Sequence, residues 1–306
     1  YGSFGYLNDE GIVPNAGYER YSARFKGSYQ AKSWLKFGAN VNYTHSETST
    51  LSEDYSTDMA SVVEQVAPIY PVYIRDEHGN IMTDENGKLY DYGTTNTALG
   101  LARPVLPNSS IQSSILNLSE TNANTFNGNG FVDITFLKDF KFTFNAGTTV
   151  REQRYFKTSN PFYGFGAEQN GTISVFHYRT TTLNLQHILN YNRSFGKHNV
   201  SAMLGHENYK YNYVQLSAEK KNMFSYWENH ELNGAIIDAA SADSYATDYN
   251  TEGYFFRGLY DYDGKYFFSG SYRRDASSRF HPDHWWGNFY SIGAAYLISR
   301  EDWFKT

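Results

Sequence analysis

The stretch at residues 21–44, YSARFKGSYQAKSWLKFGANVNYT, decides the fold class, because its apolar and polar residues alternate one by one. On both sides of Lys32-Ser33 the odd positions are apolar or small and most even positions are polar, as in Phe25 beside Lys26. Period-2 alternation predicts two strands, each with one apolar and one polar face. The short break between them predicts a tight hairpin.

The same alternation returns along the rest of the chain. It predicts strand pairs at 126–136 with 140–150, 172–193 with 198–214 and 253–262 with 265–275, and single strands at 1–7 and 286–299. This makes about ten strands in all. The predicted connections near 32, 138, 196 and 263 are short, whereas those at 8–17, 47–122, 153–171, 219–250 and 276–285 are long. Strict alternation of short and long connections is the wiring of an outer-membrane β-barrel.

Composition supports this class and excludes others. The chain has 306 residues, of which 28 are Tyr, 22 Phe and 5 Trp, and it has no cysteine and a net charge of −6. A disulfide framework and thiolate metal sites are therefore excluded, and the acidic balance argues against a nucleic-acid partner. The sequence contains no run of about 18 apolar residues, so no transmembrane helix is predicted, and no stretch resembles a signal peptide.

The connection at 47–122 is predicted to be a large structured extracellular loop. Met59, Val62, Val63 and Val66 have the spacing of a short amphipathic helix that opens after residues 56–58. Residues 74–92 read as small hairpins that turn at 76–80 and at 85–87.

Three stretches resemble the SusC/RagA-like TonB-dependent outer-membrane transporters. They are WLKFGANVNYTHS at 34–46, FLKDFKFTFNAG at 136–147 and YFFRGLYDYDGKYFFSGSYRRDASSRFHPDHWWG at 254–287. Ala276 stands where the family commonly has glycine. The residues that carry the family motif are Arg273, Arg274, Asp275, Ser277, Ser278, Arg279, Phe280, Trp286 and Gly287.

The resemblance implies that residues 1–306 are an internal part of a transmembrane barrel of about 22 strands. We expect the plug domain and the N-terminal signal to be absent from this stretch. A complete ten-stranded barrel is the structural alternative.

The resemblance also implies a function. Such transporters import oligosaccharides or peptides, which a SusD-like lipoprotein lid encloses and which the TonB complex drives inward through the missing N-terminal region. Two alternatives from other classes stay open: a passive porin-like barrel, and a soluble all-β glycan-binding module.

Candidate sites follow from aromatic and charged positions. Aromatic residues in the long connections are candidates for contact with a ligand or the lid: Tyr70, Tyr73, Tyr90, Tyr92, Tyr226 and Trp227. Tyr209, Tyr211 and Tyr213 and the pair Trp285-Trp286 are predicted to be aromatic girdles at the membrane surface. We predict no catalytic residues and no cofactor. We also predict no metal site, because the His and Asp cluster at 281–284 is best explained as a loop turn. Charged residues on the polar parity are predicted to face the lumen: Arg24, Lys26, Lys36, Lys141 and Arg151.

Overall fold

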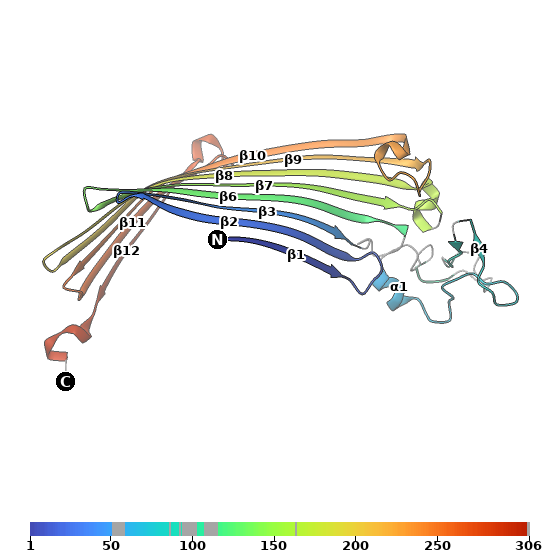
Figure 1. The fold of residues 1–306 in the computed structure, drawn as a ribbon, viewed down its shortest axis with the longest axis horizontal. Coiled ribbons are helices and arrows are strands. Elements are labelled where there is room, and N and C mark those ends of the chain that lie inside the picture. The colour runs from blue at the N-terminus through green and yellow to red at the C-terminus, as the bar shows by residue number, and fades with distance from the viewer. Residues whose placement is uncertain are drawn as a thin grey trace.

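The computed structural model describes residues 1–50, 59–85, 87–91, 93, 103–106, 116–162 and 164–304. Its main feature is one strongly curved sheet of ten strands in the order β1-β2-β3-β6-β7-β8-β9-β10-β11-β12 (Figure 1). The strands are β1 (Gly2–Glu10), β2 (Gly17–Lys32), β3 (Leu35–Ser49), β6 (Ser119–Phe136), β7 (Phe140–Ser159), β8 (Thr172–Phe195), β9 (His198–Met223), β10 (Ala235–Tyr262), β11 (Tyr266–Ser277) and β12 (Trp286–Tyr296). Every neighbouring pair is antiparallel.

This confirms the predicted hairpin pairs and the count of about ten strands. The strands form a single sheet, whereas a β-sandwich needs two sheets packed face to face. Short turns connect the strands at one end, and α1 (Met59–Gln65) and the small hairpin of β4 (Thr83–Asp84) and β5 (Gly87–Lys88) lie at the other end, right in Figure 1. Short and long connections therefore alternate, as predicted. The remaining elements are short 3-10 helices: η1 (Gly164–Gln169), η2 (Leu232–Gly234), η3 (Pro282–His284), η4 (Ile298–Arg300) and η5 (Asp302–Phe304).

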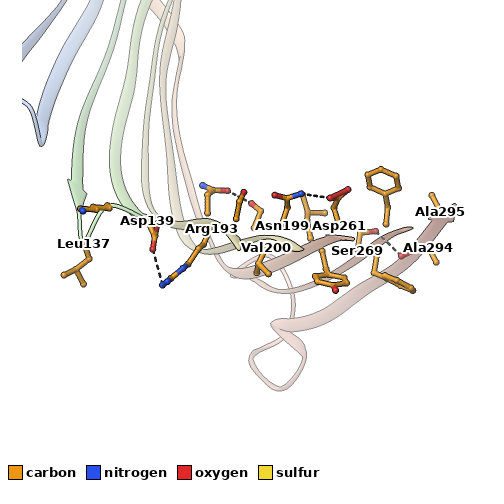
Figure 2. A pocket seen from close by; sticks show the side chains of 18 residues that line it. Leu137, Asp139, Arg193, Asn199, Val200, Asp261, Ser269, Ala294 and Ala295 are labelled. Atoms are coloured by element: carbon orange, nitrogen blue, oxygen red, sulfur yellow. Dashed lines mark hydrogen bonds and ion pairs between the residues drawn. The ribbon is translucent and has the colours of Figure 1, made fainter. Parts of the chain in front are cut away.

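The ladder register fixes which residues share a face. Phe25 pairs with Val41, Leu204 with Phe256 and Phe256 with Tyr272, so the apolar residues of successive strands lie on the same side. Side chains alternate across a strand, and the polar residues therefore line the opposite side. Figure 2 shows the alternation near the short turns, where Asn199 and Asp261 point to one side of the sheet and Val200 to the other.

Two rows of aromatic rings bound the apolar face. Near the short turns, Phe140 and Tyr191 have ring centroids 4.9 Å apart, and Tyr266 stacks on Tyr296 at 4.9 Å. The second row lies farther from the short turns, and we call it the upper row. It contains Tyr6 against Tyr21 at 5.0 Å, His206 against Tyr254 at 4.8 Å and Tyr254 against Trp286 at 6.1 Å. By strand parity, all the residues of both rows lie on the apolar face: Tyr6, Tyr21, Phe140, Tyr191, His206, Tyr254, Tyr266, Trp286 and Tyr296.

The spacing of these rows matches a bilayer. On β2 the segment between the rows runs from Tyr21 to Tyr29, and on β10 it runs from Tyr254 to Tyr262, which is nine residues in each case. A tilted strand needs about 9–11 residues to cross the hydrocarbon core of a membrane. The apolar face therefore has the height and the aromatic borders of a membrane-spanning wall.

Several strands continue far beyond the upper row, which corrects the predicted connection at 219–250. β9 runs on to Met223 and β10 begins at Ala235, so the connection is only 224–234. The missed part of β10 lacks the apolar alternation, because Ser244, Asp248 and Asn250 stand on the parity that is apolar in the membrane-spanning part of the strand. Outside a membrane both sides of a strand meet water, and the contrast between its faces is lost.

The connection between β3 and β6 has ordered elements of its own in the described residues. The hairpin turn at 76–80 is confirmed by the bridge between Arg75 and Ile81. The predicted helix is present as α1, but its stripe is only partly right, since Val62 is buried while Val63 is exposed. The residues predicted to open it, 56–58, lie outside the described residues. No helix in the described part of the chain is long and apolar enough to cross a membrane.

Candidate functional site

The polar face of the sheet is hollowed at the end with the short turns. A hollow of about 980 Å³ lies against β8–β12, with Asn192, Asn199, Ser201 and Asp261 in its wall (Figure 2). Asn199 donates from Nδ2 to Asp261 Oδ1 at 2.6 Å, and Ser201 donates to Asn192 Oδ1 at 2.6 Å. Paired amides, hydroxyls and carboxylates form a wall that tolerates water or another polar surface.

A second hollow of about 670 Å³ lies on the same face against β2, β3, β6, β7 and β8. Lys26 and Lys36 line it together with Asn129 and Gln186. The ladder places the cations of the prediction on this polar side: Arg24, Lys26, Lys36, Lys141 and Arg151. Lys141 forms an ion pair of 3.0 Å with Asp133, which lies on the same face.

The motif residue Arg273 organises a cluster at the height of the upper aromatic row, on the polar face. Its Nε donates to both carboxylate oxygens of Asp275 at 2.7 and 2.8 Å, and its Nη2 lies 3.5 Å from Glu207 Oε2. Its guanidinium also stands 5.4 Å from the centre of the Phe255 ring. Phe255 in turn covers Gly205, with which it pairs directly across the strands. The ring therefore occupies the space that a side chain at residue 205 would fill.

Adding a methyl group at Gly205 is expected to disturb this cluster. Gly205→Ala places a Cβ in steric clash with Cε2 and Cζ of the Phe255 ring, and displacement of the ring costs about 1–3 kcal/mol. The midpoint temperature of the heat-modified gel shift should fall. Gly270→Ala is the matched control, because nothing lies within 4 Å of a Cβ at that strand position. Equal midpoints for the two variants would contradict the covered-glycine arrangement.

The other motif residues are divided between the two faces. Arg274 lies over the Trp286 ring at 4.8 Å on the apolar face. Gly287 pairs with Asp275 on the neighbouring strand, and both lie on the polar face. Ser278 Oγ accepts from the Asn250 amide at 2.9 Å. The motif thus ties β10, β11 and β12 together, and six of its residues line one hollow of about 660 Å³: Arg273, Asp275, Ser277, Phe280, Trp286 and Gly287.

The turn after β11 completes the motif. Ser277 Oγ accepts from the Arg279 amide at 3.3 Å, and Trp285 Nε1 donates to the Phe280 carbonyl at 2.8 Å. The Phe280 side chain is exposed, while the Arg279 guanidinium stands 3.9 Å from the centre of the Tyr249 ring. By ladder parity Tyr249 lies on the polar face, so the motif loop reaches over that face.

The loop aromatics predicted to meet a ligand lie in separate places. Tyr73 and Tyr90 form a β-bridge with ring centroids 4.7 Å apart, and Lys88 Nζ lies 5.3 Å from the Tyr73 ring centre. Burial is the main cause that raises the pKa of Tyr90 to about 12. Tyr70 is half-buried in the same connection, and Tyr92 lies outside the described residues.

Tyr226 is buried, with 4% of its surface exposed, in a cluster at the far end of the strands. The cluster consists of Leu116, Phe156, Ile173, Met223, Tyr226 and Ala235. The Tyr226 hydroxyl donates to the Leu116 carbonyl oxygen, and burial raises its pKa to about 12. Its neighbour Trp227 is 58% exposed and stacks on Phe162 at 5.7 Å. A molecule that reached this surface would meet Trp227 rather than Tyr226.

The structure corrects the placement of Tyr209, Tyr211 and Tyr213, which were predicted to form a girdle. Their ladder partners on β8 are Asn184, Thr182 and Thr180, which lie on the polar parity. The β8–β9 ladder has no register shift between His198 and Lys221, so parity holds along its whole length. These tyrosines therefore line the polar face beyond the membrane-spanning band. Strand parity counted along β9 from the turn at 196–197 is enough to place these three tyrosines on the polar face.

More aromatic side chains join them on the same face of β7–β10. Ring centroids are 5.5 Å apart for Tyr155 and Phe176, 6.2 Å for Phe176 and Tyr178, 6.3 Å for Tyr178 and Tyr213, and 6.3 Å for Tyr213 and Tyr245. We call these five residues the inner aromatic row. Below it, Tyr249 contacts Tyr211 at 4.9 Å and Tyr209 at 5.9 Å.

The described residues contain no cluster of three or more side chains that could hold a metal ion. His281 Nδ1 lies 3.4 Å from Asp283 Oδ2 in the turn that contains η3, and both side chains are well exposed. At the turn 76–80, hydrogen bonds from Asn80 lower the pKa of Asp76.

Comparisons with known proteins agree with this geometry. No model of a known protein family matches the chain. TonB-dependent receptor P39 of Formosa agariphila is 25% identical over 317 residues, covering 100% of this chain and 27% of that protein. TonB-dependent receptor SusC of Bacteroides thetaiotaomicron is 24% identical, covering 99% of this chain and 30% of that protein. The chain thus spans less than a third of the length of these curated relatives.

Solved structures show the same architecture. The structure of the RagAB peptide transporter matches with a TM-score of 0.74 and 24% identity, over 98% of this chain and 32% of the other. The ferric citrate transporter FecA in its unliganded form matches with a TM-score of 0.51 at 7% identity, over 98% of this chain and 37% of the other. Ten strands with this curvature and order therefore have the fold of a segment of such a β-barrel.

Proposed function

We propose that the chain is part of the β-barrel of a SusC/RagA-like TonB-dependent transporter, and that it forms wall strands and surface loops of an outer-membrane nutrient importer. In this proposal the whole protein takes up oligosaccharides or peptides. The single observation that carries it is the two-faced sheet, whose apolar face is bounded by aromatic rows that enclose nine-residue segments of β2 and β10.

The partners belong to the same proposal. The described strands continue well past the upper aromatic row and carry large surface connections, which gives a SusD-like lipoprotein a broad surface to cover. The polar hollows near the short turns provide a lining against which a plug domain packs. Energy for import comes from the TonB complex, which acts on a part of the protein outside this chain. The chain itself supplies wall and binding surface and no catalytic group.

Growth experiments in the source bacterium test the proposal. The gene is deleted, and growth is measured with single glycans or a tryptic casein digest as the nutrient. We expect loss of growth on a narrow set of them, and the same loss when TonB is depleted. Re-expression of the full-length protein should restore growth only while TonB is present. Uptake that persists without TonB would instead identify a passive porin-like barrel.

A further inference from the structure

The inner aromatic row lies on the part of the wall that stands clear of the membrane band. Tyr178 lies nine residues beyond His187, whose ring contacts the upper-row residue His206 at 5.5 Å. At about 3.3 Å per residue this is roughly 30 Å along β8. An interfacial girdle cannot explain the row, because the row lies on the polar face and far from the band. Packing against lipid is therefore not its role.

A pocket opens at the upper end of the row. η1 borders an open pocket of about 470 Å³ on the polar face of β7, β8 and β9, and its Gly166 and Gln169 form part of the pocket wall. Tyr155 and Phe176 line the cavity with their rings, and Lys157, Gln169, Ser174 and Glu219 supply its main polar side chains. The Ser174 hydroxyl donates to Glu219 Oε2 at 2.8 Å, which orients that carboxylate. A cavity of this volume falls within the range of small-molecule sites.

The chemistry of this surface fits one class of ligand. A sugar ring has apolar C–H faces that pack on aromatic rings, and hydroxyl edges that need both donors and acceptors. The pocket offers rings together with an amide, a hydroxyl, an ammonium and a carboxylate, so donors and acceptors are both present. From the pocket the rings continue across β8, β9 and β10 as a row with centroid spacings of 5.5–6.3 Å.

A peptide fits the surface less well. One recurring way of binding an extended peptide is to add it as a strand to a free sheet edge, where main-chain hydrogen bonds supply the affinity. β7, β8 and β9 are hydrogen-bonded to neighbours on both sides, so no edge is free along this surface. A peptide would therefore contact only side chains here, without the main-chain hydrogen bonds that such binding depends on.

We propose that the η1 pocket and the inner aromatic row form a carbohydrate-binding path, in which the pocket holds one end of an oligosaccharide and the row carries the sugars that follow. This rests on the proposed function and deepens it, because it selects glycan over peptide as the substrate. The lower tyrosines Tyr209, Tyr211 and Tyr249, with Arg279 over Tyr249, continue the path toward the membrane band.

Binding by the purified full-length protein tests the path. A glycan array with neutral, uronic-acid and sulfated oligosaccharides identifies the strongest binder, which is then titrated by calorimetry against the wild type and its variants. We expect the double variant Phe176→Ala/Tyr178→Ala to weaken binding about tenfold, since each substitution removes an aromatic ring on which a sugar packs. Gln169→Ala should also weaken binding, and it leaves the strand ladder untouched because η1 lies outside the sheet.

Leu216→Ala is the matched control, since Leu216 is exposed on β9 with the opposite parity to Tyr213. It should bind like the wild type, and all variants should keep the wild-type heat-modified gel shift. A protein that binds nothing on the array, or ring variants that keep full affinity, would overturn the path. So would tryptic casein peptides that bind more tightly than any glycan and lose affinity in the ring variants. TonB-dependent growth in those cases would leave the proposed transport standing, whereas array binding without such growth would overturn transport alone.

Discussion

Replacing Phe25 by arginine is expected to destabilise the inserted barrel by about 2–4 kcal/mol, the cost of a cation on the lipid side at the bilayer midplane. Phe25 lies midway between Tyr21 and Tyr29, whose rings border the apolar band on β2, and its side chain is 61% exposed in the isolated wall. The measurement is the fraction of full-length protein that shows the heat-modified gel shift of a folded barrel, together with the midpoint of its urea unfolding in lipid vesicles.

The adjacent residue provides the control. Lys26 lines the polar hollow on the other face, so Lys26→Ala removes a charge from a wet surface and should leave insertion unchanged. The pair of variants differs by one position and by face, and composition cannot explain a difference between them. Equal insertion of Phe25→Arg and Lys26→Ala would show that the two faces are assigned wrongly.

Truncating Tyr226 should have an effect of comparable or larger size, but in the connection at 224–234 and not in the membrane. Tyr226→Ala removes a buried ring from the cluster with Phe156 and Ile173, and such truncations cost about 3–5 kcal/mol. The hydrogen bond from its hydroxyl to the Leu116 carbonyl is also lost. Amide hydrogen exchange should quicken across 224–234, while exchange in the membrane-spanning parts of β9 and β10 stays slow.

Trp227→Ala is the control for this prediction. The Trp227 ring is more than half exposed, so its removal should change exchange in the connection far less. Tyr226→Phe keeps the ring and loses only the hydroxyl, which should cost about 0.5–1.5 kcal/mol. Exchange rates that rise equally in Tyr226→Ala and Trp227→Ala would contradict the buried cluster.

The alternation of residues predicted the membrane-spanning part of the fold correctly. Lipid on one side and water on the other impose opposite demands on neighbouring side chains, and residues such as Phe25 and Lys26 record that contrast directly. Turn residues such as Asp263-Gly264 then fix where the strands reverse. The pairing, the short turns and the two faces were therefore accessible from the sequence.

The regions beyond the membrane were less accessible for the same physical reason. In the first half of β10, Ser244, Asp248 and Asn250 stand on the parity that is apolar further along the strand, because water reaches both sides there and no apolar stripe marks it. The sequence also gives no reason for a phenylalanine at residue 255 on the polar face, because its ring covers Gly205 on the neighbouring strand. Burial of Tyr226 depends on Leu116, which is 110 residues away in the chain. Local patterns carry no information about such partners.

The candidate site, too, could be predicted from the sequence only in part. The family motif at 273–280 marks a junction of three strands, and this could be located from sequence although its division between the faces could not. The inner aromatic row was hidden because its members come from four strands, β7 to β10, and their proximity depends on the register of the ladders.

The central claim, that one face of this sheet meets lipid and the other a watery lumen, can be measured residue by residue on β10. The chain contains no cysteine, so single cysteines can be placed at each position from Tyr254 to Tyr262 in the full-length protein, with any cysteine elsewhere changed to serine. Each is labelled with a fluorophore and quenched either by brominated lipid or by aqueous iodide. We predict that lipid quenches the even positions and iodide the odd ones; quenching that does not alternate along the strand would contradict the account.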